Sequence, residues 1–319
     1  MALDLGTTGL FENCRCRARA ALSSYPEYVI RLKGTLSSLV LDELLQAEFT
    51  VSVLTRSAAS IGTVPAGVTI KEVDYASTES LKAALTGHDV AIATLTSSAI
   101  SLQKPVIDAV IEVGVKRFIP AEFGAMTSEP QGKKLSIHAD AVEIQDYLAW
   151  KAEASELEYT AFAVGSFMHI LFTRTMVVDF VNRAVSLYDN GEKPFSTSRL
   201  STVAKAIVAS LQKPDETRNR LVRVYDTVLT QRKVFELAKK WTTGENWTVT
   251  KVDAETRVQD VPERLQEGSD PALIMPLFDA ALQSGSYGSQ YKNVDNELLG
   301  LGFMGDQEFE EFGLGLVQL

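Results

Sequence analysis

The sequence has few cysteines, few histidines and no long apolar run. Its only cysteines, Cys14 and Cys16, are two residues apart and provide no disulfide framework. The three histidines, His88, His138 and His169, are far apart and have no metal-ligand spacing. No apolar run reaches the ~18 residues needed to span a membrane. These absences disfavour a disulfide-rich secreted protein, a metal site and a membrane protein, and a cytoplasmic location fits best.

Basic residues are also in deficit. The 319 residues include 31 Lys and Arg against 41 Asp and Glu, a formal net charge of -10. This balance argues against nucleic acid or an anionic membrane as a partner. Neither a Walker loop nor a Ser/His/Asp elbow is visible, which disfavours nucleotidases and hydrolases. A small-molecule substrate is therefore expected, while a homodimer or a regulatory protein partner stays open.

The first half of the chain alternates predicted strands with predicted helices. Apolar runs predict strands at residues 28–32, 49–54, 68–73, 90–95, 115–119 and 159–164. Helices are expected at 39–46, from a Ser77 cap to Gly87, after Pro105, and at 137–154. Such alternation is typical of βαβ units and a parallel sheet.

The second half is less regular. It predicts an extended stretch at 185–187, a helix at 203–211, a strand at 221–225, a helix at 231–241 and a Gly/Ser/Asn-rich loop at 285–296. We therefore expect a poorly ordered extension at 1–26 and a dinucleotide-binding domain at 27–165. A smaller α/β substrate-binding region at 166–319 would be interleaved with that domain.

The segment 113–124, VGVKRFIPAEFG, organises this prediction. Gly114 is expected to close a helix and Pro120 to end a short strand. The loop that follows is expected to expose Glu122 and Phe123. Because ligands bind outside the carboxyl ends of strands in open α/β sheets, this loop could form a wall for a cofactor or substrate. An ordinary strand–loop junction is the alternative.

The first strand–helix turn is poor in glycine. A G-x-x-G-x-x-G spacing would place glycines at positions 31, 34 and 37, but only Gly34 is present beside Arg31 and Ser37. The Ser37 side chain is expected to push the helix N-terminus outward and weaken dinucleotide binding. At the end of the second strand stands Arg56, with no carboxylate nearby in the sequence. This favours NADP over NAD because a guanidinium can pair with a phosphate, unless Arg56 is only a solvated charge.

Acid–base chemistry has weak candidates. Tyr147 and Lys151 form a Y-x-x-x-K pair one helical turn apart, as short-chain dehydrogenases use for proton transfer. The neighbouring Leu148 and Trp150 are equally consistent with ordinary packing.

Taken together, these segments resemble the NmrA-like, isoflavone-reductase-like branch of the short-chain dehydrogenase superfamily, especially its fungal members. The resemblance covers residues 28–301. It is strongest at 39–45, 49–57, 103–109, 295–302 and in the RFIP-x-EFG string of residues 117–124. It implies a Rossmann-type, doubly wound parallel sheet with a smaller C-terminal α/β domain. It also implies an NADPH-dependent reductase of a carbonyl or activated double bond in a small aromatic or secondary metabolite.

The resemblance assigns expected roles to individual positions. The cofactor-binding positions that it implies are Gly34, Thr35 and Leu36 on the pyrophosphate, Arg56 on the 2′-phosphate, Asp74 and Thr96 along the adenine and nicotinamide-ribose path, and Phe123 beside the nicotinamide. His169 falls at the border of the substrate, where it is either a weak acid–base candidate or a pocket-lining residue.

Three departures from the family pattern bear on activity. Arg31 and Ser37 replace loop glycines, Ala121 replaces a serine, and Ala141 stands where reductases of this kind carry their catalytic lysine. The catalytic group is thus unassigned. A dinucleotide-binding regulator without turnover is the alternative function. An inactive product with an altered segment 1–33 is a third interpretation.

Overall fold

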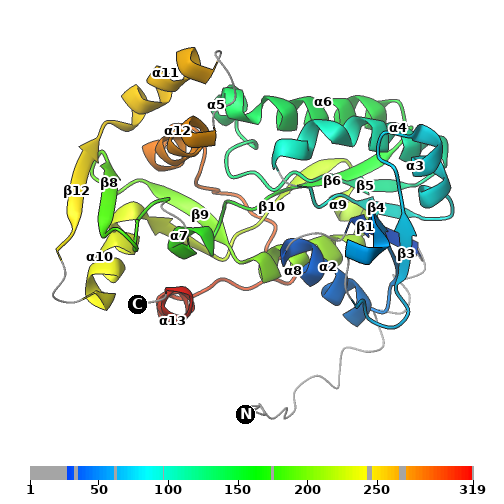
Figure 1. The fold of residues 1–319 in the computed structure, drawn as a ribbon, viewed down its shortest axis with the longest axis horizontal. Helices are drawn as coiled ribbons and strands as arrows, with labels where there is room; N and C mark the ends of the chain where they lie inside the picture. The colour runs from blue at the N-terminus through cyan, green and yellow to red at the C-terminus, as the bar shows by residue number, and fades with distance from the viewer. Residues whose placement is uncertain are drawn as a thin grey trace, which may run out of the picture.

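The computed structural model describes residues 27–31, 35–60, 63–95, 97–173, 176–242, 246–265 and 271–317. Their main feature is a seven-stranded sheet in the order β10-β6-β5-β4-β1-β2-β3, in which all neighbours are parallel (Figure 1). The strands are β1 (Glu27–Arg31), β2 (Thr50–Thr55), β3 (Thr69–Glu72), β4 (Val90–Ile92), β5 (Arg117–Ile119), β6 (Glu158–Ala163) and β10 (Arg220–Arg223). From β1 the chain adds β2 and β3 on one side, and then crosses to add β4, β5 and β6 on the other. Such folds bind dinucleotides at this switch in strand order, between β1 and β4.

Helices cover both faces of this sheet (Figure 1). One face carries α3 (Thr78–Leu85), α4 (Gln103–Glu112) and α6 (Ala139–Glu153), and the other carries α2 (Thr35–Gln46) and α8 (Leu200–Leu211). The strands are apolar because both of their faces are buried; in β2, for example, every residue after Thr50 is buried. The predicted Rossmann-type α/β class is therefore confirmed.

Local signals set most of these boundaries. The Ser77 side chain accepts a hydrogen bond from the Ser80 amide and caps α3, as predicted. Gly87 and Gly114 follow α3 and α4 with φ of +86° and +78°, a conformation that glycine adopts without strain. The prediction was wrong at α2, which begins at Thr35 rather than at residue 39.

The second part of the molecule contains two small sheets. One has the order β11-β9-β7 and the other pairs β12 with β8. These strands are β7 (Ser166–Phe167), β8 (Ala184–Tyr188), β9 (Pro194–Ser198), β11 (Thr227–Thr230) and β12 (Thr248–Val252). The surrounding helices are α7 (Ile170–Thr173), α10 (Gln231–Trp241), α11 (Ala254–Leu265), α12 (Pro271–Ser284) and α13 (Asp306–Leu316).

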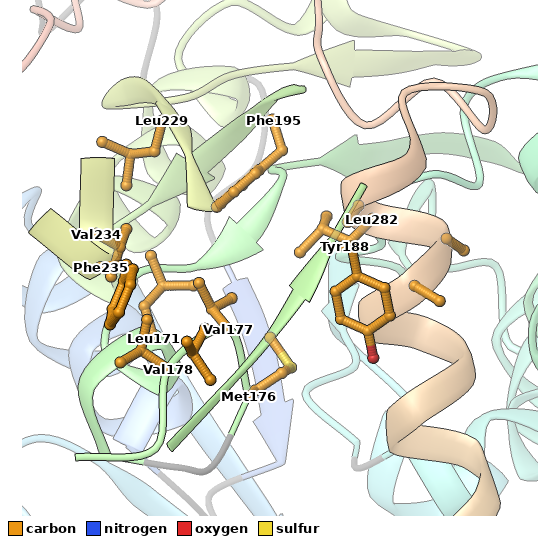
Figure 2. Packing of buried hydrophobic residues seen from close by; sticks show 14 of the residues in the cluster. Leu171, Met176, Val177, Val178, Tyr188, Phe195, Leu229, Val234, Phe235 and Leu282 are labelled. Carbon is orange, nitrogen blue, oxygen red and sulfur yellow. The ribbon is translucent and has the colours of Figure 1, made fainter. Parts of the chain in front are cut away.

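A separate hydrophobic core holds this second part together. Figure 2 shows Leu282 of α12 and Tyr188 of β8 on one side of it, and Val234 and Phe235 of α10 on the other. The two parts are interleaved in sequence, because α8, α9 (Pro214–Thr217) and β10 lie with the large sheet although they follow β9. Among the described residues, no helix is both long and apolar enough to cross a membrane.

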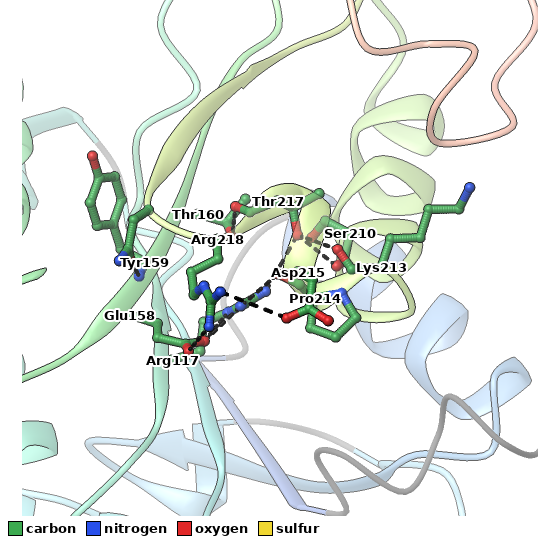
Figure 3. A network of polar contacts seen from close by, with 11 residues as sticks. Arg117, Glu158, Tyr159, Thr160, Ser210, Lys213, Pro214, Asp215, Thr217 and Arg218 are labelled. Carbon is green, nitrogen blue, oxygen red and sulfur yellow. Dashed lines mark hydrogen bonds and ion pairs between the residues drawn. The ribbon is translucent and has the colours of Figure 1, made fainter. Parts of the chain in front are cut away.

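A buried arginine fixes the start of β5. Arg117 is 1% exposed, and its guanidinium donates to Glu158 Oε2 at 2.6 Å, Pro214 O at 2.8 Å and Thr217 Oγ1 at 3.3 Å (Figure 3). The contacts join β5, β6 and α9. They lie at the amino ends of the strands, so this motif arginine supports the fold from the side opposite the strand ends where ligands bind.

Candidate active site

The loop after β5 is fixed to the start of α4. The Ala121 amide donates to Gln103 Oε1 at 2.7 Å, and Gln103 Nε2 donates to the Ile100 carbonyl at 3.2 Å. Gln103 is 1% exposed, so this link is protected from water. The loop therefore leaves the carboxyl end of β5 along a defined path.

Glu122 is buried, which corrects the expectation that it is exposed. Its side chain turns inward because two donors meet it there: Oε1 accepts from Thr127 Oγ1 at 2.5 Å and from the Gly124 amide at 3.1 Å. Burial raises the pKa of the Glu122 carboxyl. Its neighbour Phe123 is half-buried and packs against the cores on both faces of the large sheet. Residues 121–125 thus form an anchored loop at the edge of the site, called the rim below.

A distant tyrosine closes this rim. The Tyr291 hydroxyl donates to the carbonyls of Gly124 at 2.9 Å and Ala125 at 2.8 Å, and accepts from the Gly165 amide at 3.1 Å. Tyr291 is 3% exposed. It therefore joins the loop after β5, the end of β6 and the loop at 285–296. The sequence analysis missed this residue; the only local signal is an aromatic side chain within a Gly/Ser/Asn-rich loop.

The helix α2 begins at the carboxyl end of β1. Gly34 lies outside the described residues, Thr35 is exposed at the first position of the helix, and Leu36 is half-buried against the core. The free amides of a helix N-terminus at this place can receive an anionic group. The position agrees with a pyrophosphate site, although the role of these residues stays a prediction.

Ser37 has a partner in the neighbouring strand segment. Its side chain is 1% exposed, and its hydroxyl donates to Thr94 Oγ1 at 2.9 Å, just beyond β4. The serine was expected to push α2 outward. Instead, the side chain fits between α2 and the segment after β4, because its hydroxyl makes a hydrogen bond there.

Arg56 stands exposed at the end of β2, and no described residue forms an ion pair with it. A carboxylate lies nearby after all: Glu72 is the register partner of Thr55 and accepts from the Ala58 amide at 2.6 Å. The expectation of no neighbouring carboxylate holds along the sequence but not across the sheet. Because the Ala58 amide engages Glu72 Oε1, that oxygen stabilises the loop that presents Arg56.

Of the remaining cofactor positions, Asp74 is exposed and its Oδ1 accepts from the Ala76 amide at 2.9 Å, in a turn that leads into α3. Thr96 lies outside the described residues.

The Y-x-x-x-K pair lies on the side of α6 that faces α4. The Tyr147 hydroxyl bonds to Asp108 of α4, and burial together with this carboxylate raises the pKa of Tyr147 to about 12. Lys151 pairs with Glu156 at 2.8 Å and lies over the rings of Tyr147 and Trp150. This arrangement serves packing between α4 and α6 and brings neither group to the loop after β5.

The side of α6 that faces the loop carries Ala141 and Gln145, one turn apart. Ala141 is buried, and Gln145 Nε2 lies 3.5 Å from the Thr127 carbonyl. The expected lysine position thus points toward the site, where it offers only a methyl group. His169 is half-buried after β7, with its ring 6.0 Å from that of Phe167 and its carbonyl bonded within α7.

Comparison with known proteins decides the family. A family model described as "NmrA-like family" matches residues 28–269. The chain belongs to the NmrA-like family. It is 33% identical to "Oxidoreductase aprR" of Aspergillus flavus over 260 residues, which is 79% of this chain and 86% of that protein. It is 27% identical to "Oxidoreductase poxI" of Penicillium oxalicum over 281 residues, which is 85% and 88% of the two chains.

Solved structures share the fold of this NmrA-like protein. The structure "AtPrR2 with NADP+ and (+)pinoresinol" superimposes with a TM-score of 0.71 at 18% identity, over 92% of this chain and 99% of that one. The NADPH complex of leucoanthocyanidin reductase from Vitis vinifera gives 0.69 at 16% identity, over 91% and 99%. At these identities the likeness shows the fold alone. The fungal oxidoreductases, which are closer in sequence, support an oxidoreductase of the NmrA and isoflavone-reductase type.

Proposed function

We propose that the protein is an NADP-dependent oxidoreductase that reduces an activated double bond or a carbonyl of a small aromatic or secondary metabolite. The observation that carries the proposal is Arg56, which is exposed without an ion pair among the described residues, beside the dinucleotide crevice of a family whose relatives are named oxidoreductases. The donors present fit NADPH: the α2 N-terminus can receive the pyrophosphate and Arg56 the 2′-phosphate.

When bound, NADPH supplies a hydride. The chain's own residues bind and orient the cofactor and the substrate and enclose them in the site. Phe123, held at the rim by the Tyr291 contacts, offers an aromatic surface to a planar ring. Glu122 fixes the path of the rim through Gly124 and Thr127. These contacts support a role in positioning rather than in proton transfer.

The alanine at position 141 narrows the substrate class. A lysine there would stabilise a strongly basic product anion, and Ala141 cannot. Electron-poor acceptors, such as enones or quinones, give reduced products that are weaker bases and can take their proton from water. We therefore favour an activated double bond over an unactivated ketone.

A dinucleotide-binding regulator without turnover is the second candidate, and the same Ala141 favours it. Titration calorimetry with NADPH, followed by NADPH oxidation assays with an enone, a quinone and an aromatic ketone, separates the two. Turnover of the enone or quinone supports the reductase. Binding without turnover of any acceptor supports the regulator, and absence of NADPH binding contradicts both.

A further inference from the structure

A polar cavity has in its wall Tyr291, the residue that holds the loop after β5. Its volume is about 560 Å³, which is within the range of small-molecule sites. It is formed by the start of β9, the end of β10, residue Glu129 before the short helix α5 (Pro130–Lys133), and the loop at 285–293. It is therefore built from segments that are distant in sequence.

The cavity concentrates positive charge on an acidic protein. Three cationic side chains, Lys193, Arg223 and Lys292, line it together with one carboxylate, Glu129. Both lysines are exposed, and among the described residues neither forms an ion pair. The net charge of the chain is -10, so this local excess of positive charge is not a reflection of composition.

Two buried polar atoms in its wall, Arg223 Nε and Ser289 Oγ, have no hydrogen-bond partner among the described residues. Arg223 donates from Nη2 to the Ser128 carbonyl at 3.3 Å and lies 3.6 Å from Glu129, but its buried Nε has no hydrogen-bond acceptor within the described part of the chain. Ser289 is 1% exposed, and its hydroxyl also lacks a described partner. Buried donors in this state are rare, because each loses its hydration without compensation.

The character of these groups indicates the ligand. An arginine fork with two lysines and a hydroxyl donor matches the oxygens of carboxylate or phosphate groups. We propose that this cavity binds a small organic or inorganic polyanion through Arg223, Lys292, Lys193 and Ser289. Glu129 offsets one positive charge, so the ligand carries at least two negative charges.

The cavity is separate from the crevice proposed for the dinucleotide phosphates. β10 lies three strands from β4 in the sheet, and strands are ~4.8 Å apart, so Arg223 is on the order of 15 Å from that crevice. The inference does not depend on the proposed function, since an anion could bind here with or without turnover.

Titration calorimetry with citrate, and separately with pyrophosphate, tests the inference and tells carboxylate from phosphate. One equivalent should bind to the wild type at the cavity. Pyrophosphate can also fill the dinucleotide phosphate site, and that second equivalent is the one that Arg56→Ala should weaken. Arg223→Gln and Lys292→Gln should each weaken binding about tenfold, as expected for a lost charged contact. Lys292 is exposed, so its replacement should not disturb folding.

Two further variants are controls. Lys205→Gln removes one exposed charge from α8, and Arg56→Ala removes the charge expected at the dinucleotide site. Both should keep the cavity equivalent that Arg223→Gln and Lys292→Gln weaken. Absence of binding to either anion at millimolar concentration overturns the proposal. It is equally overturned if Arg56→Ala abolishes binding while Arg223→Gln and Lys292→Gln leave it unchanged.

Discussion

Arg56 should determine which nicotinamide cofactor the protein prefers. It is exposed at the end of β2, where a 2′-phosphate is expected. The wild type should therefore bind NADPH more tightly than NADH. Arg56→Ala should weaken the binding of NADPH roughly ten- to a hundredfold, because one charged contact is lost. The affinity for NADH should stay nearly unchanged. Calorimetric titration of both cofactors measures this; equal affinities in the wild type would contradict the assignment.

The residue at position 141 should control the rate of reduction. Ala141→Lys places an amine on the side of α6 that faces the loop after β5, and should raise the rate of NADPH oxidation with an aromatic ketone by roughly 10²–10⁴. Ala154→Lys, which adds the same charge at the exposed end of α6, is the control. If Ala141→Lys has no effect while His169→Ala abolishes a robust wild-type activity, the proton donor is His169.

Asp279 should make stability depend on pH. Its carboxyl is buried beside the second core, and this burial raises its pKa from 3.8 to about 7. Between these two values the unfolded chain loses the proton and the folded chain keeps it. The free energy of unfolding should therefore fall as pH rises from about 4 to about 7, and the stability contribution should be fully present only at lower pH.

Urea unfolding of the wild type and Asp279→Asn at about pH 5 and about pH 8 isolates this contribution. Other carboxyl groups titrate alike in both proteins, so the difference belongs to Asp279. The asparagine variant should lose part of the pH dependence. An identical dependence in the two proteins would show that the Asp279 carboxyl titrates normally.

Several secondary structure elements depend on one arginine. Arg117 joins β5, β6 and α9, and Arg117→Met keeps the apolar stem but removes the donors to Glu158, Pro214 and Thr217. We expect a loss of about 2–4 kcal/mol in the free energy of unfolding, since Glu158 is partly solvated and its charge is not stranded in the core.

Arg218→Met is the matched control, because Arg218 pairs with the same Glu158 at 3.4 Å but is half-exposed. Its replacement should cost about 0.5 kcal/mol or less. Urea unfolding measures both variants. Similar losses would mean that burial of Arg117 adds nothing to the pair.

The sequence predicted elements where the determining interactions are local. The Ser77 cap and the glycines at 87 and 114 act within a few residues, and these boundaries were found. Prediction from the sequence failed where the hydrogen-bond partner of a residue comes from another helix or strand. Glu72 reaches the Ala58 amide through the β2–β3 register, and Thr94 accepts from Ser37 across 57 positions, so neither contact has a local signal.

The candidate site shows the same division. The segment 117–124 was found from its own residues and the NmrA-like family was confirmed. The inward turn of Glu122 and the anchoring role of Tyr291 were missed, because Tyr291 bonds to groups 126 and 167 positions away. The lining of the anion cavity likewise comes from four separate segments. Such convergence depends on tertiary packing, which apolar periodicity does not encode.

The interleaved order of the two parts has a consequence during synthesis. β6 ends at Ala163, but its outer partner β10 begins only at Arg220, after the first strands of the small sheets have been made. A growing chain therefore displays the outer edge of β6 without its neighbour while residues 164–219 are translated. Unpaired edges can capture other strands. Ribosome-bound chains stalled before residue 220 should thus recruit chaperones more strongly than chains stalled well beyond β10, and equal recruitment would show that the edge is protected during translation.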